Sequence, residues 1–368
     1  MADQKKSARI LTSYYKPKPG GFCTRYFRAI EALLSNGNEV HYLAVSKFPI
    51  DDENCHFHRF PWPEQFTDNI LFWFILHLFS PVILLFLGYR YKISHAFAFG
   101  PTYSLMLQPL SILKKIPLTL FLRADTIENH IIKGTPKWIV FIERFLEGLS
   151  IFNVRLYGVS ESLAKNIVAR HSYFRPKLAS ILRNDILANR PGVEVSPKKK
   201  LRMGCVGILE KRKNQIFLIK LMQYLDKYDI ELLIFGVGPI ESLLREITKN
   251  YDVEKQVVFK GWVDRENIWS SIDLLLMPSL HEGAPNAVLE AIAVNMPVLA
   301  SDIPEHREIL PDQCLLPLGK LEQWVTTIVS INTNKESKLK ELQNAVSGTK
   351  TTLVFDWDTK VRNLILTS

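Results

Sequence analysis

The chain has 368 residues, of which 47% are hydrophobic and 23% charged, a globular composition that excludes a disordered chain. This length exceeds what one hydrophobic core usually spans, so we expect two domains. The formal net charge of +9 favours an anionic partner: nucleic acid, an anionic membrane or a phosphorylated small molecule. The basic residues show neither aromatic interleaving nor a known nucleic-acid motif, so we expect no nucleic acid partner.

The four cysteines are too far apart for a zinc knuckle or a redox pair, and we interpret them as buried thiols of a reducing compartment. The first residues lack the apolar core and cleavage site of a signal peptide. Together these features predict a cytoplasmic location.

The first half of the chain alternates predicted strands with helices. A strand at 9–13 leads through a loop containing Gly20 and Gly21 into a helix at 24–34 and a strand at 39–45. This order predicts a parallel sheet. Further strands are predicted at residues 92–97, 118–122, 154–158 and 178–182.

An apolar segment at residues 70–88 contains no acidic or basic residue. Its nineteen residues are at the lower limit for a membrane span, and Pro81 interrupts it, while Arg90 and Lys92 follow. Three interpretations are open: a spanning helix, an apolar surface that dips into one leaflet, and a buried pair of helices.

A polar stretch at 190–200, rich in proline and lysine, is typical of a linker. A second alternation follows it, with strands predicted at residues 201–206, 231–235, 257–259, 274–278 and 297–300. These strands are continuously apolar, as expected when helices cover both faces of a parallel sheet. We therefore predict an N-terminal domain at 1–194 and a C-terminal domain at 195–353.

The most informative stretch follows the strand that ends at Met277. Pro285 suits the first turn of a helix, so the loop before it lies at the carboxyl end of a parallel strand, where α/β sheets bind ligands. The helix N-terminus suits a phosphate, and Gly283 permits close approach of a ligand. Glu282 suits sugar hydroxyls, and Glu290, slightly over two helical turns later, suits a diol; the alternative is that both are solvated helix charges.

Residues 282–301, EGAPNAVLEAIAVNMPVLAS, resemble the E-x7-E signature of retaining glycosyltransferases of family 4, also called group 1. Asn295 stands where glycine is usual, and the match continues through 302–308. The resemblance covers most of residues 8–365. It implies an α/β, GT-B fold of two Rossmann-like doubly wound domains that face a central cleft, with the C-terminal helix at 354–368 joining the first domain.

The resemblance also implies a donor site. Lys213 matches the family's lysine, whereas Ile208 replaces its usual arginine, for which Lys211 or Arg212 is a candidate substitute. The Gly20–Gly21 loop is expected to meet the donor diphosphate, and the backbone near Val263 the nucleobase. The implied donor-binding residues are Gly20, Gly21, Arg212, Gly236, Val263, Gly283, Ala284, Pro285, Asn286 and Glu290.

For catalysis the resemblance points to Glu282 and Lys213, and to the N-terminal domain, where the family commonly places a histidine at a strand end. His95 is one candidate, with a structural histidine as the alternative. Asp125 is another, in a segment without a histidine, and Arg123 is expected on the acceptor side.

We expect no metal and no cofactor. Residues 356–358 match the D-x-D pattern of GT-A enzymes, but a helix cap explains them better, and no cluster has metal-ligand spacing. Lys213 and two helix N-termini are expected to neutralise the leaving diphosphate.

The predicted function is therefore retaining transfer of a hexose from a nucleotide sugar to a lipid-linked acceptor or a growing envelope glycan, such as lipopolysaccharide. A span at 70–88 would put Gly20 and Glu282 on opposite sides of a bilayer, so a buried segment or one in the membrane plane remains. The aromatic residues with flanking Arg90 and Lys92 favour contact of 70–92 with an anionic membrane surface, as in a peripheral protein of the inner face of the cell membrane. The alternatives are a catalytically weakened nucleotide-sugar-binding member and another GT-B enzyme, such as a sugar-nucleotide epimerase.

Overall fold

The computed structural model describes residues 7–18, 20–174, 176, 178–186 and 200–367. The chain divides into two compact units. The N-terminal unit comprises residues up to Ile127, Thr135–Arg183 and the tail from Asp356, and the C-terminal unit comprises Glu128–Gly134 and Asn184–Phe355. The predicted domain boundary at 194/195 and most of the predicted linker lie outside the described residues.

The N-terminal unit is built on a parallel sheet of seven strands in the order β3-β2-β1-β4-β5-β6-β7. Strands β1 to β3 are added toward one edge of the sheet and strands β4 to β7 toward the other, so the connecting helices cover both faces of the sheet. The strands are β1 (Arg9–Ser13), β2 (Glu39–Ala44), β3 (Cys55–Arg59), β4 (His95–Phe99), β5 (Leu118–Leu122), β6 (Arg155–Gly158) and β7 (Leu178–Ile181).

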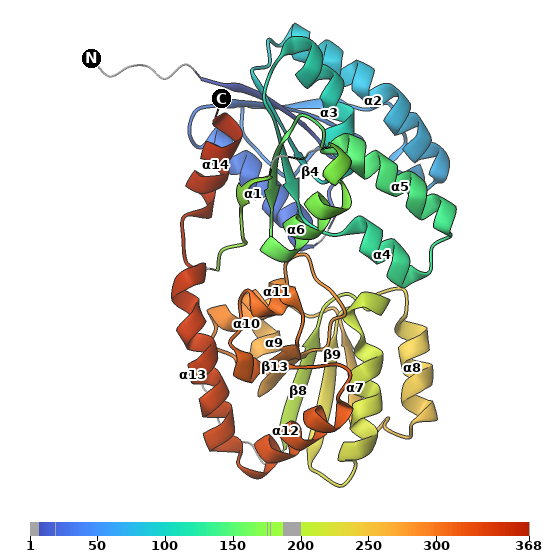
Figure 1. Ribbon diagram of the computed structural model, residues 1–368, viewed down its shortest axis with the longest axis vertical. Helices are drawn as coiled ribbons and strands as arrows, with labels where there is room; N and C mark the ends of the chain where they lie inside the picture. Colours follow the sequence, from blue (N-terminus) through green and yellow to red (C-terminus); the bar gives the residue numbers. More distant parts are fainter. Residues whose placement is uncertain (1–6, 19, 175, 177, 187–199, 368) are drawn as a thin grey trace, which may run out of the picture. The chain divides into compact units, whose positions relative to one another are not determined.

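The helices of this unit form two groups (Figure 1). One group contains α1 (Gly21–Leu34), packed against the C-terminal helix α14 (Trp357–Leu366). In the other, α2 (Ile70–Arg90) and α5 (Lys137–Ser150) both pack against α3 (Pro101–Lys114). The remaining helices are α4 (Thr126–Lys133), which begins in this unit and ends in the other, and α6 (Glu161–Arg170).

The apolar segment forms one continuous helix, α2, which runs through Pro81, so the interpretation as a pair of buried helices is wrong. One side of α2 is buried in the unit through Phe72, Leu76 and Leu84. The helix is long and apolar enough to cross a membrane by length and composition, but only 28% of its most apolar window is buried. Its opposite side exposes the large side chains of Ile70, Leu71, Phe74, Leu78, Phe79, Val82, Phe86 and Tyr89.

The C-terminal unit has a parallel sheet of six strands in the order β10-β9-β8-β11-β12-β13. The strands are β8 (Leu201–Val206), β9 (Ile230–Phe235), β10 (Val257–Gly261), β11 (Leu274–Met277), β12 (Val298–Ser301) and β13 (Leu315–Leu316). The helices are α7 (Gln215–Met222), α8 (Glu241–Asn250), α9 (Arg265–Trp269), α10 (Asn286–Ala293), α11 (Pro304–Arg307), α12 (Leu321–Thr333) and α13 (Lys335–Leu353).

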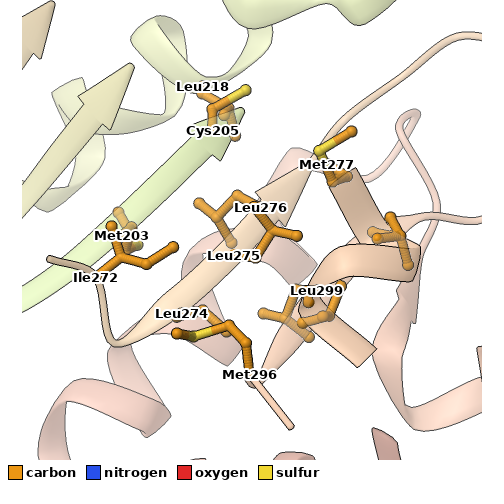
Figure 2. Close-up of a cluster of buried hydrophobic side chains, with 14 of the residues drawn as sticks. Met203, Cys205, Leu218, Ile272, Leu274, Leu275, Leu276, Met277, Met296 and Leu299 are labelled. Atoms are coloured by element: carbon orange, nitrogen blue, oxygen red, sulfur yellow. The ribbon is translucent and has the colours of Figure 1, made fainter. Parts of the chain in front are cut away.

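The core of this unit forms around β11, whose four residues are all buried. Figure 2 shows Leu275 and Leu276 of β11 among side chains of the neighbouring strands and loops, including Met203, Met296 and Leu299. Full burial of such a side chain contributes about 1.5–3 kcal/mol relative to leaving it exposed. The core therefore fixes the end of β11, from which the candidate site begins.

Candidate functional site

A buried cluster of charges lies where β8 and β11 end. Glu282, in the loop after β11, is 2% exposed and accepts three side-chain hydrogen bonds. Its Oε1 accepts from Lys213 Nζ at 2.6 Å and from Ser279 Oγ at 2.7 Å, and its Oε2 accepts from an Arg212 guanidinium nitrogen at 2.8 Å. We call Glu282, Lys213, Arg212 and Ser279 the Glu282 cluster.

The electrostatics of the cluster keep Glu282 ionised. Burial raises its pKa, but the charges of Lys213 and Arg212 and the hydrogen bonds from Lys213 and Ser279 outweigh burial and lower the pKa to about 2. Two cations therefore share one carboxylate at neutral pH. An anionic ligand at this carboxyl edge of the sheet would compete with Glu282 for the two cations.

Arg212 supplies the second cation that the sequence left open. It lies in the short 3-10 turn Lys211–Lys213 and also forms an ion pair of 2.5 Å with Glu210. Ile208, at the position of the expected arginine, is 47% exposed. Of the two candidate substitutes, Arg212 lies in the cluster, whereas Lys211 is exposed.

A second layer of side chains supports the cluster. Ser301, which ends β12, donates from its Oγ to the Ser279 carbonyl at 2.6 Å, and its own carbonyl lies 2.8 Å from Nδ1 of the fully buried His306. Burial lowers the pKa of His306. Sequence reasoning missed Ser279, Ser301 and His306 as members of the site. Ser301 and His306 lie within residues 282–308, which resemble the family, whereas Ser279 precedes that segment.

The helix after the loop begins one residue later than predicted. Pro285 is the N-cap of α10, and Asn286 is the first helical residue, its side-chain oxygen accepting from Asn184 at 2.7 Å. The expectation of two helical turns between Glu282 and Glu290 is wrong, because only Glu290 lies on the helix, where it forms an ion pair of 3.0 Å with Arg265. Gly283 is buried and Ala284 half-buried in the loop between them.

Glycines line the same edge of the sheet. Gly207 and Gly236 follow β8 and β9, and Gly261 ends β10. Gly236 has a φ of 126°, and a Cβ placed on it would lie 2.0 Å from the Gly207 carbonyl oxygen, so the turn requires glycine. The structure therefore places Gly236 and the nearby Val263 at the carboxyl edge where the Glu282 cluster lies.

The remaining predicted residues belong to the N-terminal unit. Gly20, with a φ of 133°, is the N-cap of α1, and Gly21 is its first residue. Arg123 follows β5 and lies over the Phe99 ring at 5.6 Å from its centroid; burial, together with the charge of Arg25, lowers its pKa to about 9. These residues lie at the carboxyl edge of the first sheet.

Asp125 also follows β5 and is buried, but both of its carboxylate oxygens are bound by Arg170, at 2.9 and 2.5 Å. Arg170 forms a further ion pair of 3.0 Å with Glu147. This network ties α5 and α6 to the β5 loop. A role of Asp125 in catalysis stays a prediction.

The position of His95 does not support its predicted catalytic role. His95 is the first residue of β4 and pairs with Ile10 of β1, so it lies at the amino edge of the sheet. The carboxyl end of the strand, at Phe99, is about 13 Å away along an extended chain. The predicted strand at 92–97 starts too early, because Lys92 has a left-handed φ of 53° and belongs to the preceding turn.

The D-x-D pattern caps a helix, as predicted. Asp356 is the N-cap of α14, and its Oδ1 accepts from the Thr359 backbone N–H at 2.9 Å. Asp358 forms an ion pair of 2.6 Å with Arg28 of α1. Asp356 therefore caps α14, and Asp358 ties α14 to α1 of the N-terminal unit.

Comparison with protein families gives a match to the model described as glycosyl transferases group 1, over residues 200–334. A UDP-Gal:alpha-D-GlcNAc-diphosphoundecaprenol alpha-1,3-galactosyltransferase of Escherichia coli is 25% identical over 194 residues, which are 46% of this chain and 49% of that protein. The chain spans 28–49% of the length of the curated relatives it matches first.

Solved structures match nearly the whole chain. Sucrose-phosphate synthase from Thermosynechococcus elongatus has a TM-score of 0.74 at 16% identity, and 96% of each chain is covered. HepE from Anabaena, in complex with UDP-glucose, has a TM-score of 0.72 at 13% identity, with 97% of this chain and 98% of that chain covered. At these identities the likeness shows a shared fold.

Proposed function

We propose that this chain is a group 1 glycosyltransferase, which transfers a hexose from a nucleoside diphosphate sugar to an acceptor with retention of the anomeric configuration. The match of residues 200–334 to that family and the GT-B fold, which the sequence predicted, support this proposal. The observation that carries the proposal is the buried Glu282, which holds Lys213 and Arg212 at the carboxyl edge of the second sheet. A cationic pair at this edge is suited to a diphosphate.

In the proposed reaction the bond between the anomeric carbon and the diphosphate oxygen breaks, and its electron pair stays on the diphosphate. Lys213 and Arg212 stabilise that growing negative charge, together with the positive end of the α10 dipole near Asn286. An acceptor hydroxyl attacks the face that the leaving group departs from. Its proton passes to the departing phosphate oxygen, so the step requires no separate general base.

Glu282 has two tasks in this proposal. Its ionised carboxylate fixes the positions of both cations before the donor binds, which limits the reorganisation needed during the reaction. When the cations turn to the diphosphate, the carboxylate oxygens become available for the hydroxyls of the donor sugar. We propose that two cations at the leaving group make the transfer independent of a metal.

The comparisons support particular substrates for the test. HepE holds UDP-glucose, and the Escherichia coli relative acts on a sugar linked to diphosphoundecaprenol. We therefore propose a UDP-hexose as the first donor to test and a lipid-linked saccharide of envelope glycan synthesis as the acceptor class.

A lipid-linked acceptor fits the exposed surface of the N-terminal unit. The exposed side of α2 and the neighbouring Trp138, Phe141 and Phe145 of α5 form what we call the apolar face. α2 and α5 both pack against α3, and neither α2 nor α3 contains an acidic residue, whereas α5 contains the half-buried Glu143 and the buried Glu147. The exposed basic residues on or next to these helices are Arg90, Lys92, Lys115, Lys137 and Arg144. We propose that this face rests on an anionic membrane at the cytoplasmic side.

The proposed function is tested by measuring the binding and slow hydrolysis of UDP-, GDP- and ADP-hexoses, with and without EDTA. The wild type is compared with Glu282→Gln and with Glu246→Gln, which changes an exposed glutamate on α8 of the same unit. We expect one donor to bind and turn over in EDTA, with turnover lost in Glu282→Gln and kept in Glu246→Gln. NMR of the product with a lipid-linked acceptor then gives the anomeric configuration.

Three results would contradict parts of the proposal. Binding of a donor without turnover by the wild type would indicate a weakened family member. Loss of turnover in EDTA would overturn the metal-independent step. Equal turnover by Glu282→Gln and the wild type would contradict the proposed role of the Glu282 cluster in the reaction.

A further inference from the structure

Three histidines and a glutamate lie together on β2 and the edge strand β3 of the first sheet. Glu39 and His41 alternate on β2, so their side chains lie on one face of the strand. His56 on β3 is the direct partner of His41 across the parallel pair, and His58 is two residues further along β3 on that same face. The pairing of β2 with β3 therefore brings four side chains that can bind a metal close together.

Three of these side chains bring their possible ligand atoms close to one another. Glu39 Oε1 lies 2.9 Å from His41 Nε2 and 3.2 Å from His56 Nε2. The three ligand atoms all lie within 4.8 Å of one another. Ligands about 2.0–2.1 Å from a tetrahedral zinc ion are about 3.3 Å apart, so a small outward movement makes room for the ion.

From this geometry we propose that Glu39, His41 and His56 form a binding site for a first-row divalent transition metal such as Zn²⁺. Two imidazole nitrogens and one carboxylate oxygen are a ligand set that zinc uses, with a water molecule in the fourth position. The side chain of His56 is 39% exposed and that of Glu39 24% exposed, which gives an ion a path from solvent.

Neighbouring side chains orient two of the proposed ligands, Glu39 and His41. Arg9 Nε donates to Glu39 Oε2 at 2.8 Å, which leaves Oε1 to face the two imidazoles. His41 Nε2 donates to Glu39 Oε1 at 2.9 Å, because a carboxylate can only accept, and His41 Nδ1 lies 2.9 Å from His58 Nε2. Binding of an ion at His41 Nε2 requires the other tautomer, with the proton on Nδ1 and His58 Nε2 as its acceptor.

The proposed site is structural and separate from the proposed transfer reaction. Glu39 begins β2, as Arg9 begins β1, so the cluster lies at the amino edge of the sheet, whereas the predicted ligand edge is at the carboxyl ends. β3 is the edge strand of this sheet. An ion shared between β2 and β3 would fasten that edge strand and stabilise the folded N-terminal unit.

The test uses the full chain without an affinity tag, freed of metal by EDTA and dialysed. Zn²⁺ is titrated by calorimetry at pH 7.5, and Co²⁺ is added in parallel to look for the visible absorption of a tetrahedral site. The variants are His56→Ala, which removes the most exposed ligand, and Glu39→Gln; the control is His77→Ala, which removes a histidine on α2. Circular dichroism checks that each variant is folded.

We expect one Zn²⁺ per wild-type chain, a rise of the Tm with Zn²⁺, and at least a tenfold loss of affinity in His56→Ala and Glu39→Gln but not in His77→Ala. His58→Ala should weaken binding less, because His58 only orients His41. Absence of wild-type binding, or equal binding by the wild type and His56→Ala, would overturn the proposal. Donor turnover in EDTA is a separate measurement, so the two proposals can fail independently.

Discussion

At the scale of single residues, the proposed chemistry depends most on Lys213, which is buried and bound to Glu282 at 2.6 Å. We predict that Lys213→Ala lowers kcat about 10²–10³-fold, because loss of one preorganised cation or donor at a developing anion has an effect of that order. Lys211→Ala is the matched control, since Lys211 is an exposed lysine in the same turn. Steady-state kinetics of donor hydrolysis measures both, and equal losses in the two variants would argue against a specific role of Lys213.

The lowered pKa of Glu282 predicts how the free energy of unfolding depends on pH. Its pKa is lowered in the folded chain from 4.5 to about 2, so its ionised form stabilises the fold above pH 4.5, and this contribution is lost as the pH falls from about 4.5 through 2. The free energy of unfolding should therefore differ between wild type and Glu282→Gln by a constant amount from pH 7 to pH 5. The difference should shrink at pH 3. A difference that already changes between pH 7 and pH 5 would assign the effect to another group.

At the scale of elements, the end of α10 explains why an asparagine replaces the usual glycine. Asn295 follows the C-cap Val294 with a left-handed φ of 55°, a conformation that asparagine tolerates better than other residues with a side chain. We predict that Asn295→Gly changes the free energy of unfolding by less than about 0.5 kcal/mol, whereas Asn295→Val lowers it by about 1–2 kcal/mol.

Urea denaturation of the two variants measures this difference. The control is Asn250→Val, at the exposed last residue of α8, which lies in the helix rather than in the left-handed region. Its expected effect is below about 0.5 kcal/mol. If Asn295→Val were no worse than this control, the left-handed turn would not explain the residue at this position.

Among the strands of the first sheet, some could be predicted from the sequence and one could not. The strands at 9–13 and 118–122 were predicted to the residue. The second is a mostly apolar run, and the first is a short β-prone segment that ends where a glycine-containing loop begins. β3 was missed, since its sequence Cys-His-Phe-His-Arg carries no apolar run and it is an edge strand of partly exposed residues. The cluster of Glu39, His41 and His56 depends on the register of that missed strand, and so it could not be found from spacing along the chain.

For the Glu282 cluster, the sequence motif located Glu282 and Lys213, but only the fold shows which cation joins them. Arg212 and Lys211 are adjacent and chemically similar, and the 3-10 turn directs Arg212 to Glu282. The support by Ser301 and His306 likewise comes from packing of β12 and α11 beside the loop. Motifs give residue types, whereas hydrogen-bond partners depend on tertiary structure.

At the scale of the whole molecule, the apolar face predicts how the enzyme would reach a lipid-linked acceptor. Phe74 and Phe86 of α2 are 66% and 64% exposed, although burying such a side chain is worth about 1.5–3 kcal/mol. We predict that the full chain sediments with vesicles containing an anionic phospholipid, and that Phe74→Ser combined with Phe86→Ser weakens this binding at least tenfold. High salt should weaken wild-type binding, because basic residues border the face.

Tyr224→Ser, at a residue 56% exposed in the C-terminal unit, is the control and should bind as the wild type does. Donor hydrolysis by the double variant should stay near the wild-type rate, since α2 is not part of the Glu282 cluster, while transfer to a lipid-linked acceptor in vesicles should fall. Equal sedimentation of the wild type and the double variant would exclude the apolar face as the contact. Equal binding to neutral and anionic vesicles would show that the apolar side chains account for the binding and that the basic residues do not contribute, because only the basic residues distinguish the two lipids.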